Sequence, residues 1–150
     1  MEPLDLREHP PRSPYDELDG LMLMPRTIDK LRALLPGGNT GPYYIKGPTR
    51  GISAYLLRRL GIDERELFEA VRAAKDDADV AQWLRQRADP ALYAEINQTL
   101  RRLKPKHIPN PEEFRSTYVE TMKAHPEIEH IIDIVVADDR RTFGSPDAKD

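Results

Sequence analysis

Fourteen prolines in 150 residues limit this chain's possible folds more than any other feature. Proline lacks a backbone N–H and fits only the first turn of a helix, so each proline favours a helix start or a helix end. Several follow a residue that can cap a helix, as in Ser13-Pro14, Asp89-Pro90 and Asn110-Pro111. The chain is therefore expected to form short helices joined by proline-bearing turns.

Between the prolines, apolar residues recur at three- and four-residue steps, which is the period of a helix. The steps predict helices over residues 14–20, 25–35, 53–60, 64–75, 77–88, 90–104 and 111–124. Residues 128–136 fit a helix or a strand, and we favour the helix because a lone strand has no partner. The expected fold class is all-α, a compact single-domain bundle of six to eight short helices with proline-rich turns.

The expected organisation has three parts. Residues 1–12 form an N-terminal arm, residues 13–143 a single helical domain, and residues 144–150 a flexible tail of small and polar residues. A domain of this length can bury a core without help from a metal or a disulfide.

Composition excludes several chemistries and partners. The chain has no cysteine, so a disulfide framework, a zinc–thiolate site and a thiol nucleophile are excluded. Its first residues form no basic-then-apolar leader, and no apolar run approaches the roughly 18 residues of a membrane span. The formal net charge of -3 argues against nucleic acid as the main partner. These features predict a cytoplasmic protein without a membrane partner, and they leave a homo-oligomer open.

No motif for a metal or a cofactor stands out. The four histidines show no paired ligand spacing, and no lysine followed by Ser or Thr comes after the glycines of residues 36–41, so a phosphate loop is rejected. We therefore expect no metal and no cofactor.

The helix that Pro25 opens carries the strongest candidate for a site. Arg26, Asp29, Lys30 and Arg32 lie off its apolar stripe. Three interpretations remain open: a solvated ladder of ion pairs, a partly buried network in which Arg12 ties the N-terminal arm to the body, or an anion site. Tyr43 and Tyr44 follow in a glycine-rich loop, where one ring is placed to close over a ligand. The predicted ligand-binding residues are Arg12, Arg26, Asp29, Lys30, Arg32 and Tyr44.

The leading functional hypothesis is a non-catalytic binding or regulatory module for a small anion or an acidic peptide. One alternative is an enzyme acting on an anionic substrate, with Asp29 or a distant histidine as proton shuttle. The other is a structural or oligomerising protein with no ligand.

A second basic group occupies residues 101–107, with Arg101, Arg102, Lys104, Lys106 and His107. Cations are favourable where a helix ends, and this explanation is the simpler one. A patch for nucleic acid or an acidic partner is the alternative.

Several motifs together resemble a bacterial family catalogued as domain of unknown function 5069. They are Pro11-Arg12-Ser13-Pro14, Gly20-Leu21, the run from Pro25 to Ala33, and Gly41 with Tyr43 and Tyr44. Later residues add Leu60-Gly61-Ile62-Asp63, Trp83-Leu84, and Asp133 to Asp139 followed by Phe143. The resemblance implies a small soluble bacterial protein and supplies no activity.

Overall fold

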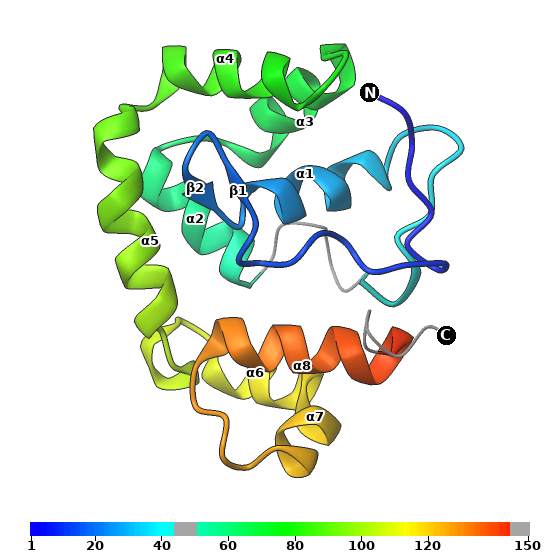
Figure 1. The fold of residues 1–150 in the computed structure, drawn as a ribbon, viewed down its shortest axis with the longest axis vertical. Coiled ribbons are helices and arrows are strands. Elements are labelled where there is room, and N and C mark those ends of the chain that lie inside the picture. The colour runs from blue at the N-terminus through cyan, green and yellow to red at the C-terminus, as the bar shows by residue number, and fades with distance from the viewer. Residues whose placement is uncertain (44–50, 145–150) are drawn as a thin grey trace. The chain divides into compact units, whose positions relative to one another are not determined.

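The computed structural model describes residues 1–43 and 51–144. Within these residues it contains eight α-helices, three short 3-10 helices and one two-stranded antiparallel sheet, which confirms a mainly α-helical fold (Figure 1). The strands are β1 (Glu17–Leu18) and β2 (Leu21–Met22). The helices are α1 (Met24–Arg32), α2 (Ile52–Leu60), α3 (Glu64–Ala73), α4 (Asp77–Arg87), α5 (Tyr93–Arg102), α6 (Pro111–Thr117), α7 (Val119–Ala124) and α8 (Ile131–Phe143). The 3-10 helices are η1 (Gly41–Tyr43), η2 (Pro90–Leu92) and η3 (Pro105–His107).

The chain divides into two compact units, Met1–Asn97 and Gln98–Asp150, with the division inside α5. The single domain expected over residues 13–143 stays a prediction. Residues 145–150 of the expected tail lie outside the described residues.

The first unit is built around α1. From Met24 to Asp29 every residue of this helix is buried, and α1 contacts both α3 and β1. The surrounding core comes from apolar side chains of α2, α3 and α4, with Leu56, Leu67 and Val80 fully buried. A helix that is buried on every side must find partners for any polar side chain it carries, and α1 carries three cations and one carboxylate.

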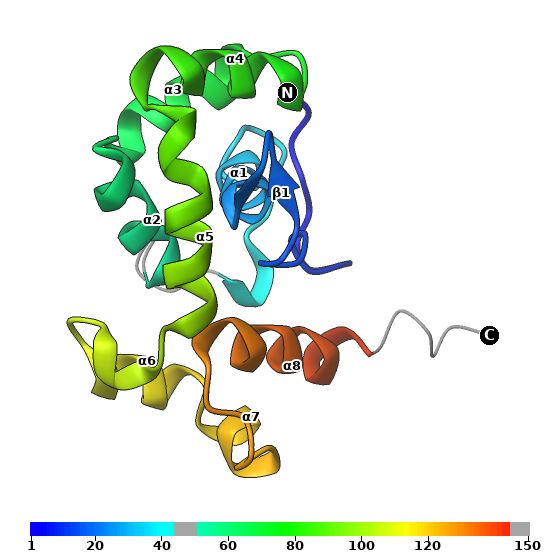
Figure 2. The ribbon, with the colours of Figure 1, turned by 60° about the vertical axis from the view of Figure 1, so that its left-hand side comes forward.

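The N-terminal residues lie against α1 within this unit, as Figures 1 and 2 show. The backbone of Leu6 donates to the carbonyl of Asn39 at 2.8 Å, and the amide of Asn39 donates to the carbonyl of Leu4 at 2.9 Å. The Leu6 side chain is fully buried. Residues 4–6 therefore form part of the first unit's body.

One predicted helix, residues 14–20, is wrong. These residues form the hairpin of β1 and β2, in which Glu17 pairs with Met22 and Leu18 with Leu21. The two-residue turn consists of Asp19 and Gly20, with φ of 54° and 86°. Asp-Gly is a strong signal for such a turn, because both central residues need positive φ.

Side chains of α4 and α5 hold the hairpin in place. Arg85 donates to both carboxylate oxygens of Asp19 at 2.7 Å, and this hydrogen bonding lowers the pKa of Asp19. Asn97 is buried, accepts from the amide of Met22 at 2.9 Å and donates to the carbonyl of Gly20 at 2.7 Å. The hairpin thus ends at Leu23 in a fixed position, from which α1 begins.

The helix starts predicted at residues 64, 77 and 90 are confirmed, whereas the cap predicted at Asn110 is wrong, because Asn110 makes no side-chain hydrogen bond at the start of α6. Asp63, Asp76 and Asp89 each accept a hydrogen bond from a backbone amide of the following helix. The side chain of Glu66, three residues after Asp63, accepts from Arg87 at 3.2 Å.

In the second unit, α6 packs against η3 and α7, and α7 packs against α8. The helix favoured over a strand for residues 128–136 is confirmed as α8, and its apolar residues Ile131, Ile132 and Val135 are buried. The single helix expected over 111–124 is wrong, because Tyr118, with φ -108° and ψ 22°, separates α6 from α7. A partly buried hydrogen bond from Thr121 to Asp138, at 2.7 Å, joins α7 to α8.

The hairpin turn gives a direct test. Gly20 has a φ of 86°, and a Cβ added there would meet no atom within 4 Å, so Gly20→Ala adds conformational strain without a clash. We expect Gly20→Ala to lower the free energy of unfolding by about 1 kcal/mol, and Gly20→Asn to lower it less, because asparagine tolerates positive φ. Urea unfolding of the three proteins measures this. Equal stability of Gly20→Ala and the wild type would contradict the turn.

Candidate functional site

The candidate site begins where the hairpin passes into α1. Leu23 adopts a left-handed conformation with φ 72°, and Pro25 occupies the first turn of the helix, where its missing N–H costs nothing. Thr27 donates its amide and its hydroxyl to the carbonyl of Leu23, at 3.0 and 2.9 Å, and so secures this turn. The charged side chains of α1 are therefore presented from a helix whose start is fixed on both sides.

Asp29 is the most constrained charged group of the site. It is 4 % exposed, and a carboxylate at such a position requires strong donors. Arg12 supplies them: its backbone amide lies 2.8 Å from one carboxylate oxygen of Asp29, and its Nη2 lies 3.0 Å from the other. The Nε of Arg12 lies 3.1 and 3.2 Å from the two oxygens. One residue thus provides both a backbone and a side-chain donor to the same carboxylate.

Arg12 also reaches a second carboxylate. Its Nη1 and Nη2 both donate to Asp77, the first residue of α4, with Nη2 at 3.2 Å. Burial alone would lower the pKa of the Arg12 guanidinium, but the hydrogen bonds to Asp77 and Asp29 outweigh it and raise that pKa well above its usual value. Arg12 therefore stays charged and links the N-terminal segment to α1 and α4.

Arg26 is as deeply buried as Asp29, with 1 % exposure. Its Nη1 donates to the backbone carbonyl of Arg12 at 3.2 Å. Its guanidinium carbon lies 5.2 Å from the centroid of the Tyr43 ring, within the range of a cation–π contact. Arg26 is thus held by a carbonyl and by an aromatic face that both come from outside α1.

Lys30 and Arg32 complete the predicted set. Lys30 is half-buried. The Nε of Arg32 donates to the carbonyl of Glu2 at 2.8 Å, and its Nη1 lies 3.9 Å from Asp29. Tyr44, the remaining predicted residue, lies outside the described residues.

The structure therefore brings Arg12, Arg26, Asp29 and Arg32 into one connected network, and this geometry matches the second of the three interpretations, the partly buried network. Two residues of this network were not among the predicted ones. Asp77 lies 65 positions from Arg12, and no local pattern connects the two. Tyr43 precedes the predicted Tyr44 directly, and its place in a glycine-rich loop is the sequence signal for it.

The charges of α1 separate into two sides. With 100° per residue, Lys30 lies about 40° from Arg26 around the helix, whereas Asp29 lies about 60° from Arg26 in the opposite direction. Arg32 lies a further 60° or so beyond Asp29. One side of α1 thus carries Arg26 and Lys30, and the other carries the carboxylate with its partners Arg12 and Arg32.

Neither a metal centre nor a membrane span emerges from the described parts of the chain. In residues 1–43 and 51–144, no group of three or more His, Asp and Glu side chains is arranged to hold a metal ion. None of the helices described there is long and apolar enough to cross a bilayer.

The Arg12–Asp29 contact predicts that loss of Arg12 destabilises the protein more than loss of an exposed arginine does. Arg12→Gln leaves the buried Asp29 without its guanidinium partner. We therefore expect the free energy of unfolding to fall by about 2–3 kcal/mol. This loss is at the low end for a buried pair, because the Arg12 side chain is 35 % exposed. Arg7→Gln is the matched control, since Arg7 makes a 2.7 Å pair with Asp5 at the surface. Urea unfolding should show the control close to wild type. Similar losses for the two variants would contradict the assignment.

Comparison with known proteins agrees with the resemblance seen in the sequence. No match was found among curated proteins. The model of one protein family, described as "Domain of unknown function (DUF5069)", matches residues 8–141 and so includes the hairpin, α1 and most of α8. The chain belongs to the DUF5069 family.

Proposed function

We propose that this protein is a non-catalytic binding module for a small anion, which it holds at the Arg26–Lys30 side of α1. The observation that carries the proposal is the fixed position of Arg26. Its guanidinium is buried between the carbonyl of Arg12 and the ring of Tyr43. A guanidinium fixed in this way is prepared to bind an oxyanion with little further loss of side-chain entropy.

The chemistry of the two cations suits an oxyanion. Arginine presents a planar fork of N–H donors that matches carboxylate and phosphate oxygens, whereas lysine adds a compact charge. Lys30 follows Arg26 by four residues, so both side chains leave the same face of α1. Asp29, which would repel an anion, is directed toward Arg12 on the other side.

The size of the ligand follows from burial. Arg26 is 1 % exposed, so an extended peptide cannot lie across its guanidinium, and the proposed ligand is limited to an anion of a few atoms. Of the two ligand classes that the sequence leaves open, the small anion therefore fits this site better.

The residues then have different roles. Arg26 and Lys30 bind the anion, and the Tyr43 ring forms a wall beside Arg26. Arg12 positions Arg26 through its carbonyl, and Asp29 holds Arg12. Arg32 holds the N-terminal segment through the carbonyl of Glu2 and does not belong to the binding set.

The proposed setting is the bacterial cytoplasm, which a chain without cysteine suits.

One observation favours a second candidate, a structural protein without a ligand. Arg12 joins the N-terminal segment to both α1 and α4, so the network stabilises the first unit whether or not an anion binds. The two functions differ in their response to added anions.

Thermal unfolding with inorganic phosphate or citrate, against chloride at equal ionic strength, tests the proposal. An anion that binds only the folded protein raises its unfolding temperature in proportion to RT ln(1 + [L]/Kd). We expect phosphate or citrate to raise it more than chloride does. Lys30→Gln should weaken the affinity about tenfold, equivalent to about 1.4 kcal/mol.

Arg72→Gln is the matched control, because Arg72 is an exposed cation of the same unit that pairs with Glu69 on α3. It removes the same charge and should leave the response to phosphate unchanged. Equal responses to all three salts, or equal loss in Lys30→Gln and Arg72→Gln, would reject the anion site and favour the structural role.

A further inference from the structure

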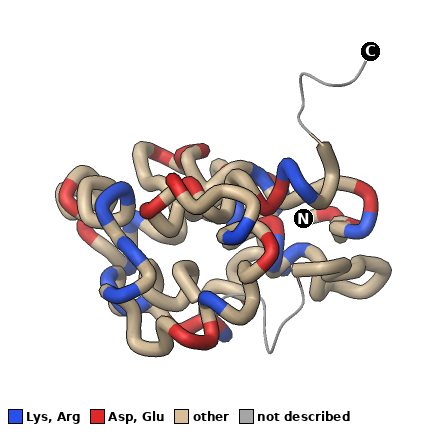
Figure 3. The backbone as a smooth tube through the Cα atoms, turned by 90° about the horizontal axis from the view of Figure 1, so that it is seen from below, with Lys and Arg blue, Asp and Glu red and all other residues tan. Residues whose placement is uncertain are grey.

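The second unit carries a basic surface that the proposed site does not use. We call residues 101–107 the basic segment: they form the last turn of α5 and the 3-10 helix η3. Four of the seven residues are Lys or Arg, which Figure 3 marks in blue along the backbone, and the segment contains no Asp or Glu. Arg101, Arg102, Lys106 and His107 are exposed.

The end of a helix explains this charge only in part. Cations stabilise a helix C-terminus either by hydrogen bonding to its last carbonyls or through the helix dipole. Backbone donors already occupy two carbonyls of the segment: Leu103 accepts from Ile131, and Lys104 accepts from His107, both at 2.9 Å. The dipole effect falls off within one turn, whereas the basic segment continues through η3.

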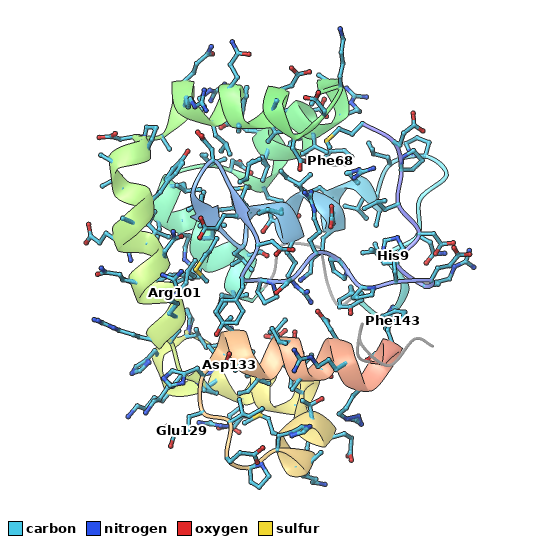
Figure 4. The ribbon with its side chains drawn as sticks, viewed as in Figure 1. His9, Phe68, Arg101, Glu129, Asp133 and Phe143 are labelled. Carbon is cyan, nitrogen blue, oxygen red and sulfur yellow. The ribbon has the colours of Figure 1, made fainter. Side chains whose placement is uncertain are left out.

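Ion pairs within the second unit also involve few of the cations of the basic segment. Lys104 lies 3.4 Å from Glu129 (Glu129 and Arg101 are labelled in Figure 4). Among the described residues, the side chains of Arg101, Arg102 and Lys106 make no hydrogen bond and no ion pair. Arg115 of the same unit, in contrast, pairs with Glu112 at 2.7 Å. Hydrogen bonds and ion pairs among the described residues therefore do not account for three exposed cations of the basic segment.

We propose that the basic segment is a docking surface for an acidic, unstructured peptide segment of a partner protein. Arginine binds carboxylates through paired N–H donors, and two consecutive arginines followed by a lysine suit a run of Glu or Asp side chains. This surface shares no residue with the anion site on α1.

Nucleic acid fits the surface less well. Binding of single strands relies on aromatic side chains that stack on bases. The aromatic residues nearest in sequence, Tyr93 and Phe114, are both buried. Three or four cations also neutralise few phosphates, and the chain as a whole has a net charge of -3.

The test uses the full-length chain and a fluorescein-labelled hexaglutamate peptide, followed by fluorescence anisotropy at low salt. We expect Arg101→Gln combined with Arg102→Gln to weaken peptide binding about five- to tenfold, because exposed ion pairs contribute modestly. Raising the salt concentration should weaken binding by the wild type.

Arg140→Gln combined with Arg141→Gln is the matched control. These arginines are also consecutive, exposed and in the last turn of a helix, α8, but Asp138 and Asp139 precede them directly. The control should bind hexaglutamate with an affinity within about twofold of the wild-type affinity. Both double variants should unfold at the wild-type temperature, because neither pair of arginines holds the described fold together.

Three outcomes would overturn the proposal: no binding of hexaglutamate by the wild type, equal losses in the two double variants, or tighter binding of an eight-nucleotide single-stranded DNA than of the peptide. Lys30→Gln should leave peptide binding unchanged, so failure here and failure of the anion site are distinguishable.

Discussion

The burial of one carboxylate organises the first unit. Asp29 lies on a helix that is surrounded by the core, and a carboxylate there is tolerated only if it is paired. Arg12 meets this requirement with its backbone amide and its guanidinium, and the same guanidinium reaches Asp77 on α4. The N-terminal segment must therefore follow α1 closely enough to place Arg12 over Asp29. The carbonyl of Arg12 then holds Arg26, so the position of the buried arginine depends on the same pair.

The basic side chains thus divide into groups with different consequences. Arg12 and Arg32 hold the N-terminal segment, and both side chains donate hydrogen bonds within the first unit. Arg26 is buried and fixed, which suits recognition of a small anion. Arg101 and Arg102 are exposed, which suits a weak contact with an extended acidic partner. The contacts that each side chain makes, more than the number of charges, therefore separate the arginines that hold the fold from the proposed binding ones.

Much of the helical framework could be predicted from the sequence, because its signals are local. Capping aspartates and apolar residues at helical spacing located α3 and α4 to within a few residues. The hairpin was missed because Ser13-Pro14 suggested a helix start, although Asp19-Gly20 carried the stronger turn signal. The charged side chains of α1 were recognised as a group, but Asp77 was not, because tertiary packing alone brings it to Arg12. The burial of Arg26 could not be predicted either, since it depends on how Tyr43 and Arg12 pack around α1.

A double-mutant cycle on Arg12 and Asp29 tests the central claim most directly. The free energy of unfolding is measured by urea denaturation for the wild type, Arg12→Gln, Asp29→Asn and the double variant. If Asp29 depends on Arg12, the double variant is much less destabilised than the sum of the single variants, with a coupling energy of about 2 kcal/mol. Additive effects, with a coupling energy near zero, would show that the two groups act independently and would contradict the account.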